Sequence, residues 1–299
     1  MKKKILIVGG TGFLGFHLAK LCKNKKFDVT SISTNPPTYN RYIKNIKYIY
    51  VDISNLNELR KKIKSKYDYV VNLGGYVDHK NKVKTYNSHF KGCKNLSNFF
   101  LNKNIKSFVQ LGSSGEYGSV NSPQKESSEG YPKSIYTKAK FLATKYLIKL
   151  FNKKNFPVTV LRLYQAYGPK QDINRFIPIV IEACMYNKNF DCSDGKQLRD
   201  FIHVEDVVNA ILKSLKSSKA KGEIINIGTG KPQKIKDVIN FLVKRLEGGK
   251  PNFGKIKLRK DEISKIYPDI SKAKKILKWT PKIKFKKGLE DTIRSYEKK

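Results

Sequence analysis

The chain has 299 residues, a length that suits one large α/β domain or a domain with a smaller appendage. Its 62 lysines and arginines outnumber 24 aspartates and glutamates, which gives a formal net charge of +38. The basic residues are spread along the whole chain and form no basic block or RNA-binding motif, so the charge favours anionic small ligands and argues against a nucleic-acid partner. The apolar runs are far shorter than the roughly 20 residues of a membrane-spanning helix, and we expect a cytoplasmic protein.

The cysteines are widely spaced, with neither a CxxC pair nor a histidine at ligand spacing. We expect free thiols in a reducing compartment and no structural metal. The four cysteines are Cys22, Cys93, Cys184 and Cys192.

The N-terminal segment "KKILIVGGTGFLGFHLAK" predicts a buried strand over residues 5–8, a glycine-rich turn and an amphipathic helix. Gly9, Gly12 and Gly15 follow the strand at GxxGxxG spacing. Glycines at these positions let the backbone approach a pyrophosphate, which then lies at the N-terminus of the helix. In a βαβ unit at the N-terminus, the pattern indicates a dinucleotide site.

The second strand, residues 28–33, ends where such folds place the residue that meets the adenosine ribose. An acidic side chain there would bind the 2′-hydroxyl and repel a 2′-phosphate, but this chain has Ser33, Thr34 and Asn35. Hydroxyl and amide groups tolerate a phosphate, so the sequence favours NADP(H) and leaves NAD(H) open. Arg41 and Lys44 are candidate helpers of a 2′-phosphate.

Strands and helices then alternate over about 165 residues. The pattern predicts strands at "IKYIYVDIS", "YDYVVNLGG", "SFVQLGSS" and "VTVLRLYQAYG", with helices over about 86–102 and 134–152. Such alternation predicts an α/β fold with a doubly wound parallel sheet, which binds ligands at the C-terminal ends of its strands.

Tyr136 and Lys140 are four residues apart on the predicted helix and therefore share one face. A lysine ammonium beside the phenol would lower the pKa of Tyr136 from about 10 toward neutrality and make it a usable acid or base. Ser113, at the end of a predicted strand, can hydrogen-bond the same phenol oxygen. The YxxxK spacing alone is common in a chain rich in Tyr and Lys. The glycine turn and the strand-end serine nevertheless favour the interpretation that Tyr136 and Lys140 are catalytic.

Together these segments resemble the extended short-chain dehydrogenase/reductase family, in particular its nucleotide-sugar branch of epimerases, dehydratases and reductases. The resemblance covers nearly the whole chain. It rests on "GGTGFLG", "VDISN", "LGSSGEYG", "YTKAK", "LRLYQAYGPKQ", "QLRDFIHVEDVVNAI", "NIGTG" and "DISKAKKILKWTP".

The resemblance implies a Rossmann domain over residues 1–170, with a later contribution from about 198–230, and a mostly substrate-binding α/β domain over residues 171–299. It implies a homodimer through the helices around 92–103 and 134–152. It further implies these roles: catalytic Ser113, Tyr136 and Lys140; cofactor-binding Gly9, Gly12, Phe13, Leu14, Gly15, Ser33, Thr34, Asp52, Ile53, Leu73, Gly74, Gly75, Tyr136 and Lys140; substrate-binding Ser114, Gln165, Arg175, Arg199, Arg259 and Glu262. Arg199 and Arg259 would hold the diphosphate, because a guanidinium fork suits phosphate geometry.

Departures from the family pattern narrow the reaction. The 4,6-dehydratases carry an Asp-Glu pair where this chain has Ser114 and Gly115; Glu116 is one position late and should face elsewhere. Water elimination is therefore not expected. Gln165 and His89 stand where the family commonly has asparagines.

Two reactions remain open. A 4-keto reductase would deliver hydride from NADPH to C4 of a 4-keto-6-deoxy sugar nucleotide while Tyr136 protonates the alkoxide. A 4-epimerase would use tightly bound NAD, and tyrosinate would take the C4 hydroxyl proton. The neutral end of the second strand favours the reductase. Two stretches that resemble the CDP-abequose synthase type of 4-keto reductase favour it too. Such a reductase would act in the biosynthesis of surface-polysaccharide sugars. A third class, a non-enzymatic dinucleotide sensor or RNA-binding protein, is disfavoured because Ser113, Tyr136 and Lys140 are all present.

Overall fold

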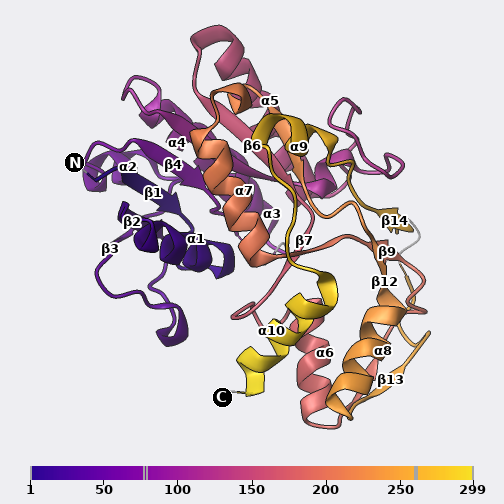
Figure 1. Cartoon of the computed structure of the whole chain (residues 1–299). Helices are drawn as coiled ribbons and strands as arrows, with labels where there is room; N and C mark the ends of the chain where they lie inside the picture. Colours follow the sequence, from indigo (N-terminus) through magenta and orange to yellow (C-terminus); the bar gives the residue numbers. More distant parts are fainter. Residues whose placement is uncertain (1, 77, 79, 259–261, 298–299) are drawn as a thin grey trace.

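The computed structural model describes residues 2–76, 78, 80–258 and 262–297. A seven-stranded parallel sheet forms its centre, in the strand order β11-β6-β5-β4-β1-β2-β3 (Figure 1). The strands are β1 Lys4–Val8, β2 Asp28–Ser33, β3 Lys47–Tyr50, β4 Tyr69–Asn72, β5 Ser107–Ser113, β6 Val158–Leu163 and β11 Ile224–Ile227. The strand order reverses beside β1, so the predicted doubly wound α/β fold is confirmed.

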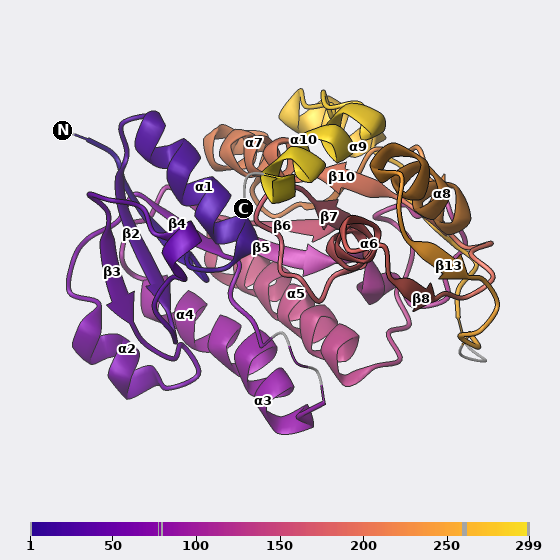
Figure 2. The same cartoon turned by 90° about the horizontal axis from the view of Figure 1, so that it is seen from below.

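Helices cover both faces of this sheet (Figure 2). Their apolar sides form two core clusters, one on each face. The first face carries α1 (Phe13–Asn24), α7 (Val204–Lys216) and α9 (Ser271–Leu277); the second carries α2 (Leu56–Lys62), α4 (Gly92–Phe100) and α5 (Ile135–Lys154). Near-continuous apolar strands such as β1 are required because both faces are covered.

The helix expected over 86–102 begins earlier and is not uniform. It consists of α3 (Lys82–Tyr86), a π-helical stretch η2 (Asn87–Lys91) and α4. The wider turn of a π-helix is frequent at functional sites, and here it contains His89, whose side chain is 6% exposed.

The single strand expected over 158–168 is also divided. β6 ends at Leu163, and the next residues form β7 (Gln165–Tyr167), which pairs with β10 (Phe201–His203) in a separate two-stranded sheet. The chain leaves the main sheet because the Gln165 amide donates to the carbonyl of Asp200, outside the main sheet.

The remaining C-terminal elements form a smaller body around a third core cluster. They are α6 Phe176–Met185, α8 Ile235–Leu246, α10 Phe285–Glu297, β8 Asn189–Asp191, β9 Leu198–Arg199, β12 Gln233–Lys234, β13 Lys250–Asn252 and β14 Lys265–Ile266. Short 3-10 helices complete the described chain: η1 Tyr39–Arg41, η3 Ser114–Tyr117 and η4 Ser218–Ala220. β11 is an edge strand of the main sheet, and α7 packs on its first face. The predicted domain bounds stay a prediction.

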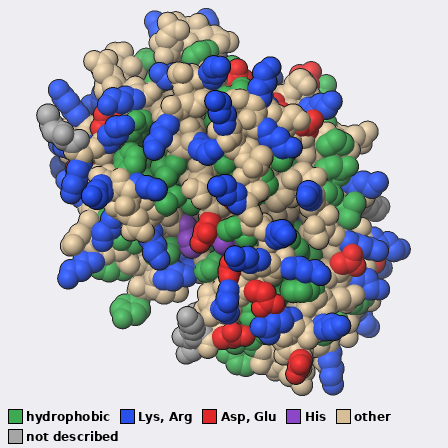
Figure 3. All heavy atoms as spheres, viewed as in Figure 1, with side chains coloured by type: hydrophobic (Ala, Val, Ile, Leu, Met, Phe, Trp, Pro, Cys, Tyr) green, Lys and Arg blue, Asp and Glu red, His purple; other side chains and the backbone are tan. Residues whose placement is uncertain are grey.

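Lysines and arginines are scattered over the face seen in Figure 3 and alternate there with apolar and acidic side chains. The four cysteines are buried free thiols. Among the described residues, no helix is both long and apolar enough to cross a membrane.

Candidate active site

A cavity of about 850 Å³ opens at the C-terminal ends of β1, β2 and β4. Twelve of the fourteen residues that the family resemblance assigned to the cofactor line this cavity, whereas Tyr136 and Lys140 are not part of its lining. The twelve are Gly9, Gly12, Phe13, Leu14, Gly15, Ser33, Thr34, Asp52, Ile53, Leu73, Gly74 and Gly75. These residues therefore lie together at one cavity, and their contact with a cofactor stays a prediction.

The glycines shape the wall of this cavity by close backbone approach. Gly9 adopts φ +75°, a left-handed conformation that side chains rarely adopt. A Cβ on Gly15 would lie 2.1 Å from the carbonyl oxygen of Gly9, so helix α1 packs directly on the turn. A Cβ on Gly12 would meet only that oxygen, at 3.3 Å, so this position faces the cavity. The turn therefore leaves room for a pyrophosphate at the N-terminus of α1.

The end of β2 is neutral, as the sequence shows, but its expected cationic helper is engaged elsewhere. Arg41 is 9% exposed, donates a 2.5 Å hydrogen bond to the carbonyl of Lys170, and forms a 2.6 Å ion pair with Asp172. The hydroxyl of Ser33 accepts from the amide of Thr11 at 3.3 Å. The geometry therefore gives no support to a role of Arg41 in holding a 2′-phosphate.

Ser113 and Tyr136 meet at the end of β5. The Tyr136 phenol is hydrogen-bonded to Ser113, which helps to lower its pKa, but burial has the larger effect and raises the pKa of Tyr136 above its ordinary value. The expected lowering toward neutrality is therefore wrong for this arrangement, in which desolvation outweighs the favourable contacts.

Lys140, one turn further along α5, is 5% exposed, and its ammonium donates to the carbonyl of Leu111 at 2.7 Å. Burial lowers the pKa of Lys140, while the charge of Glu116 opposes that effect. The ammonium is thus held against the sheet beneath the Ser113 loop.

His89 connects Tyr136 to the cavity wall. Its ring meets the Tyr136 ring edge-on, with 4.9 Å between centroids, and its Nε2 lies 3.2 Å from the carbonyl of Tyr76. A Cβ on Gly75 would lie 2.0 Å from Cε1 of His89. The imidazole therefore needs glycine at position 75, and it fills the space between the cavity and the phenol.

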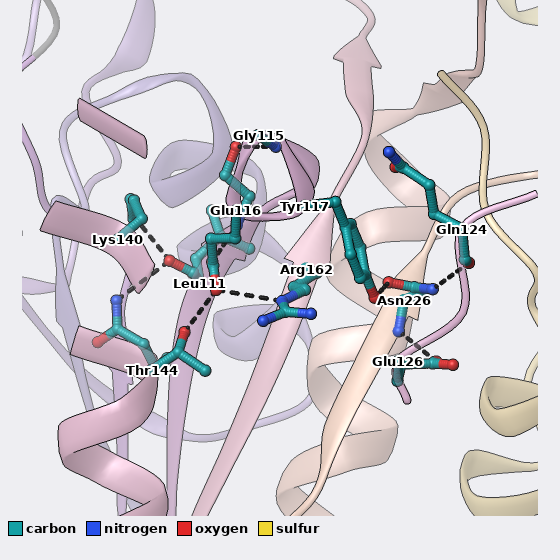
Figure 4. A network of polar contacts seen from close by, with 12 residues as sticks. Leu111, Gly115, Glu116, Tyr117, Gln124, Glu126, Lys140, Thr144, Arg162 and Asn226 are labelled. Atoms are coloured by element: carbon teal, nitrogen blue, oxygen red, sulfur yellow. Dashed lines mark hydrogen bonds and ion pairs between the residues drawn. The ribbon is translucent and has the colours of Figure 1, made fainter. Parts of the chain in front are cut away.

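Glu116 faces the protein interior and does not contribute to the cavity wall, consistent with the expected difference from a dehydratase pair. Its carboxylate accepts from the Ser113 amide at 2.8 Å, from the Thr144 hydroxyl at 2.8 Å and from Nε of Arg162 at 3.1 Å (Figure 4). The guanidinium of Arg162 lies over the ring of Tyr117.

The predicted substrate residues are only partly gathered at the cavity. Gln165 and Arg175 line it, whereas Ser114 is not part of its wall. Arg199 is 8% exposed and forms an ion pair with Glu262, which was also predicted to bind substrate. Arg259 lies outside the described residues.

Sequence reasoning missed one side of the cavity. Some of these residues follow β4, some belong to α3 or η2, and the others lie in the loop after β7. The missed residues are Tyr76, Asp78, Lys84, Asn87, Ser88, Gln171 and Asp172. An N-cap at Asn81, which accepts from the Lys84 amide, is the signal that marks the earlier helix start.

The other histidines that the structure describes, His17 and His203, have structural contacts. Nε2 of His17 lies 2.8 Å from the carbonyl of Pro169, and Nδ1 of His203 accepts from the Glu205 amide at the start of α7. His79 lies outside the described residues.

Residues 5–228 match the model of the NAD dependent epimerase/dehydratase family. The chain belongs to this family. It is therefore an enzyme of the NAD-dependent epimerase/dehydratase type, and the predicted membership of the extended branch is confirmed.

Known members of the family match this chain over nearly its whole length. A putative UDP-glucose 4-epimerase of Methanocaldococcus jannaschii is 31% identical over 97% of both chains. A CDP-abequose synthase of Salmonella muenchen is 25% identical over 98% of both. The solved structure of UDP-glucuronic acid 4-epimerase from Bacillus cereus, in complex with UDP-glucuronic acid and NAD, is 25% identical, with a TM-score of 0.89 over 99% of both chains.

Proposed function

We propose that this enzyme is an NAD-dependent 4-epimerase of a nucleotide sugar. The observation that carries the proposal is the hydrogen-bonded pair of Ser113 and Tyr136. The ring of Tyr136 contacts His89, which packs against Gly75 in the cavity wall. A hydroxyl and a phenol in contact can hold a sugar hydroxyl and transfer its proton. Relatives named as 4-epimerases support the choice of reaction.

The cavity wall fits a dinucleotide. Gly12 leaves backbone accessible at the N-terminus of α1, which suits the pyrophosphate, and Asp52 and Ile53 lie where the adenine would bind. Bound NAD+ would supply the acceptor for the C4 hydride and return that hydride to the other face of the sugar.

NAD(H) replaces NADP(H) as the favoured cofactor in this proposal. The NADP(H) expectation rested on the neutral end of β2, with Arg41 and Lys44 only as candidate helpers. Because Arg41 is buried against Asp172, the lining offers a 2′-phosphate no guanidinium from that residue. The relative solved with NAD also supports NAD(H).

In the proposed reaction, Tyr136 acts as the proton-transfer residue. In its phenolate form it takes the proton of the C4 hydroxyl, while the Ser113 hydroxyl holds the same oxygen. The C4–H bond breaks as the hydride leaves, and a C4 carbonyl forms. After the keto sugar turns over, hydride returns to C4 and Tyr136 gives its proton back, so that electrons and protons balance over one cycle.

A 4-keto reductase remains the second candidate. The neutral Ser33 and Thr34 at the cavity wall tolerate a 2′-phosphate, and the CDP-abequose synthase relative favours this reaction. The reductase uses the same residues with a single hydride delivery to the carbonyl of an NDP-4-keto-6-deoxy sugar, and Tyr136 then acts as an acid.

The first experiment is mass spectrometry of the cofactor released from the purified, denatured protein, followed by titration of NADH against NADPH. Retained NAD, with epimerisation of UDP-sugars that needs no added cofactor, is the expected result. A cofactor-free protein that prefers NADPH and reduces 4-keto-6-deoxy sugar nucleotides would replace the epimerase with the reductase. Tyr136→Phe should reduce turnover by about 100-fold or more in either case, with cofactor affinity nearly unchanged.

We further propose that two copies of the chain associate through α4 and α5. Leu142, on α5, is 40% exposed, and Phe141 and Tyr146 are only half-buried, which leaves an apolar face on this helix. Light scattering should give a dimer, and Leu142→Glu should shift it toward the monomer. A wild-type monomer at micromolar concentration would refute this assembly.

A further inference from the structure

The buried carboxylate of Glu116 is a strongly interacting group that the proposed chemistry does not use. We propose that Glu116 is a positioning residue, which fixes Ser113 at the end of β5 against Tyr136 on α5 and places a negative charge beside the proton-transfer pair. This inference rests on the proposed function, because it assigns a role toward the same proton transfer.

Glu116 and Ser113 are joined in a tight turn directly after β5. The hydroxyl of Ser113 accepts from the Gly115 amide at 3.1 Å, and Oε1 of Glu116 accepts from the Ser113 amide at 2.8 Å. This reciprocal capping box closes η3 directly after β5. The backbone of Ser113 is thereby fixed by Glu116, and the hydroxyl that meets Tyr136 belongs to the same turn.

The other carboxylate oxygen of Glu116 binds side chains of two further elements. Oε2 of Glu116 accepts from the hydroxyl of Thr144 at 2.8 Å and from Nε of Arg162 at 3.1 Å. Thr144 is on α5, two turns after Tyr136, and Arg162 is on β6 beside β5 (Figure 4). One carboxylate therefore ties together the strand end that carries Ser113, the helix that carries Tyr136 and the neighbouring strand.

The burial of the ion pair between Glu116 and Arg162 indicates a role beyond stability. Glu116 is fully buried and Arg162 is 3% exposed. A buried ion pair loses most of its Coulomb energy to desolvation, and well-packed apolar residues of similar size often serve stability equally well. Directional acceptance from the Ser113 amide is something that an apolar replacement cannot provide.

The charge of Glu116 also affects the pKa values of the predicted catalytic residues. The groups that act on the Tyr136 side chain come from several elements: Ser113 of β5, Glu116 of η3, Arg175 at the start of α6 and His89 of η2. The charge of Glu116 raises the pKa of Tyr136, and that of Arg175 lowers it. Glu116 also raises the pKa of Lys140 and so helps it to remain an ammonium.

Glu116→Gln tests the charge while it keeps a carbonyl oxygen for the Ser113 amide. We expect turnover to fall about 10-fold, and KM for the nucleotide sugar to stay within about 3-fold, because no substrate contact is removed. The rising limb of kcat against pH, in the direction that needs tyrosinate, should move to lower pH, because the negative charge that raises the pKa of Tyr136 is gone.

Asp206→Asn is the matched control. Asp206 is also a buried carboxylate and accepts from the amides of Lys282 and Ile283, both at 2.9 Å, but on α7 away from the cavity wall. Its neutral replacement should lower stability without moving the pH profile. An unchanged pH profile in Glu116→Gln, with turnover lost only in proportion to stability, would overturn the proposal.

The double variant Glu116→Met with Arg162→Met serves if the single variant does not fold. It removes both charges together, so folding should return. A purely structural role predicts that activity returns with the fold; the proposal predicts that turnover stays at least about 10-fold down, because the Ser113 amide has lost its acceptor.

A readout without substrate separates this inference from the proposed function. Protein labelled with ¹³Cζ-tyrosine is titrated by NMR, and the Tyr136 signal is assigned by its loss in Tyr136→Phe. The Tyr136 phenol of Glu116→Gln should titrate at lower pH than that of the wild type, even if the wild type turned over no nucleotide sugar. Identical titration curves would refute the role of Glu116, whatever the reaction.

Discussion

The ammonium of Lys140 donates a 2.7 Å hydrogen bond to the main-chain carbonyl of Leu111. The same oxygen accepts from the side-chain amide of Gln110 at 3.1 Å, and that amide's oxygen accepts from Asn72, whose own oxygen accepts from the Gly74 amide. Lys140 is therefore connected through buried polar groups to the glycines of the cavity wall. Its burial lowers its pKa, so the charge is kept at an energetic cost.

Lys140→Met should separate stability from activity. The substitution removes a buried charge and keeps the length of the side chain, and Leu111 retains Gln110 as a donor. We expect the free energy of unfolding to stay the same or rise by about 1 kcal/mol, while turnover falls by about 100-fold. Urea unfolding and steady-state kinetics measure the two effects.

Lys149→Met, an exposed position on the same helix, is the control for the substitution itself. It should change neither quantity. If Lys140→Met lost stability and activity in parallel, Lys140 would be a structural residue and the catalytic assignment would be wrong.

Two glycines of the N-terminal turn should respond in opposite ways to alanine. In Gly15→Ala the new Cβ would lie 2.1 Å from the Gly9 carbonyl oxygen, so α1 must shift, and we expect a loss of about 3 kcal/mol in stability. In Gly12→Ala the nearest atom is 3.3 Å away and the methyl group faces the cavity, so stability should hold while NAD affinity falls about 10-fold or more.

Thermal unfolding without added cofactor, and fluorescence titration with NADH, separate the pair. Equal loss of stability in both variants would contradict the placement of Gly12 at the cavity. Unchanged NADH affinity in a folded Gly12→Ala protein would count against the pyrophosphate assignment.

Local patterns predicted the part of the site that local structure builds. The strand, glycine turn and helix of residues 4–24 follow from apolar runs and glycine spacing, and five predicted residues of this segment line the cavity. The other seven predicted lining residues lie at later strand ends, and those after β3 and β4 were assigned by the family resemblance. Ser113 and Tyr136 also meet as expected, because both are set by the ends of regular elements.

The contacts that join distant segments could not be predicted in this way. Arg41 pairs with Asp172, Glu116 with Arg162, and Arg199 with Glu262, at separations of 131, 46 and 63 residues. Each pairing depends on how the loops fold back over the sheet, which no local period encodes. For the same reason, the sequence could not show that Asp172 engages Arg41, a candidate helper of a 2′-phosphate. The raised pKa of Tyr136 was not predicted either, because it depends on burial in the folded protein.

Arg199 should affect substrate binding more than chemistry. Its guanidinium is paired with Glu262 and donates to the carbonyl of Leu198 at 2.9 Å, and the diphosphate of a nucleotide sugar would compete for the same fork. We expect Arg199→Met to raise KM about 10-fold or more with kcat within about 3-fold. Steady-state kinetics over a range of nucleotide-sugar concentrations measures both.

Arg245→Met is the control, because Arg245 forms an exposed ion pair with Glu290 between α8 and α10. It should leave KM unchanged. If Arg199→Met altered kcat and not KM, or lowered only stability, the pairing with Glu262 would be structural and the diphosphate assignment would fail.

His17 should make the fold sensitive to mild acid. It lies on α1, with Nε2 2.8 Å from the Pro169 carbonyl, and burial lowers its pKa to about 4. The unfolded chain binds a proton below a pKa of about 6.5, whereas the folded protein resists protonation, so the unfolded state holds more protons in this window. Stability from His17 is therefore fully present above pH 6.5 and is lost as the pH falls from 6.5 to 4, by on the order of 2 kcal/mol.

His17→Gln keeps an amide that can donate to Pro169 but cannot take up a proton. Its unfolding free energy should fall less than that of the wild type between pH 6.5 and 4, as measured by urea unfolding at several pH values. His203, whose pKa burial also lowers, should keep part of the slope in this variant, so His203→Gln is the companion control. Parallel stability curves for wild type and His17→Gln would mean that His17 is protonated as readily in the folded protein as in the unfolded chain, contrary to the burial that α1 and the loop at Pro169 impose on it.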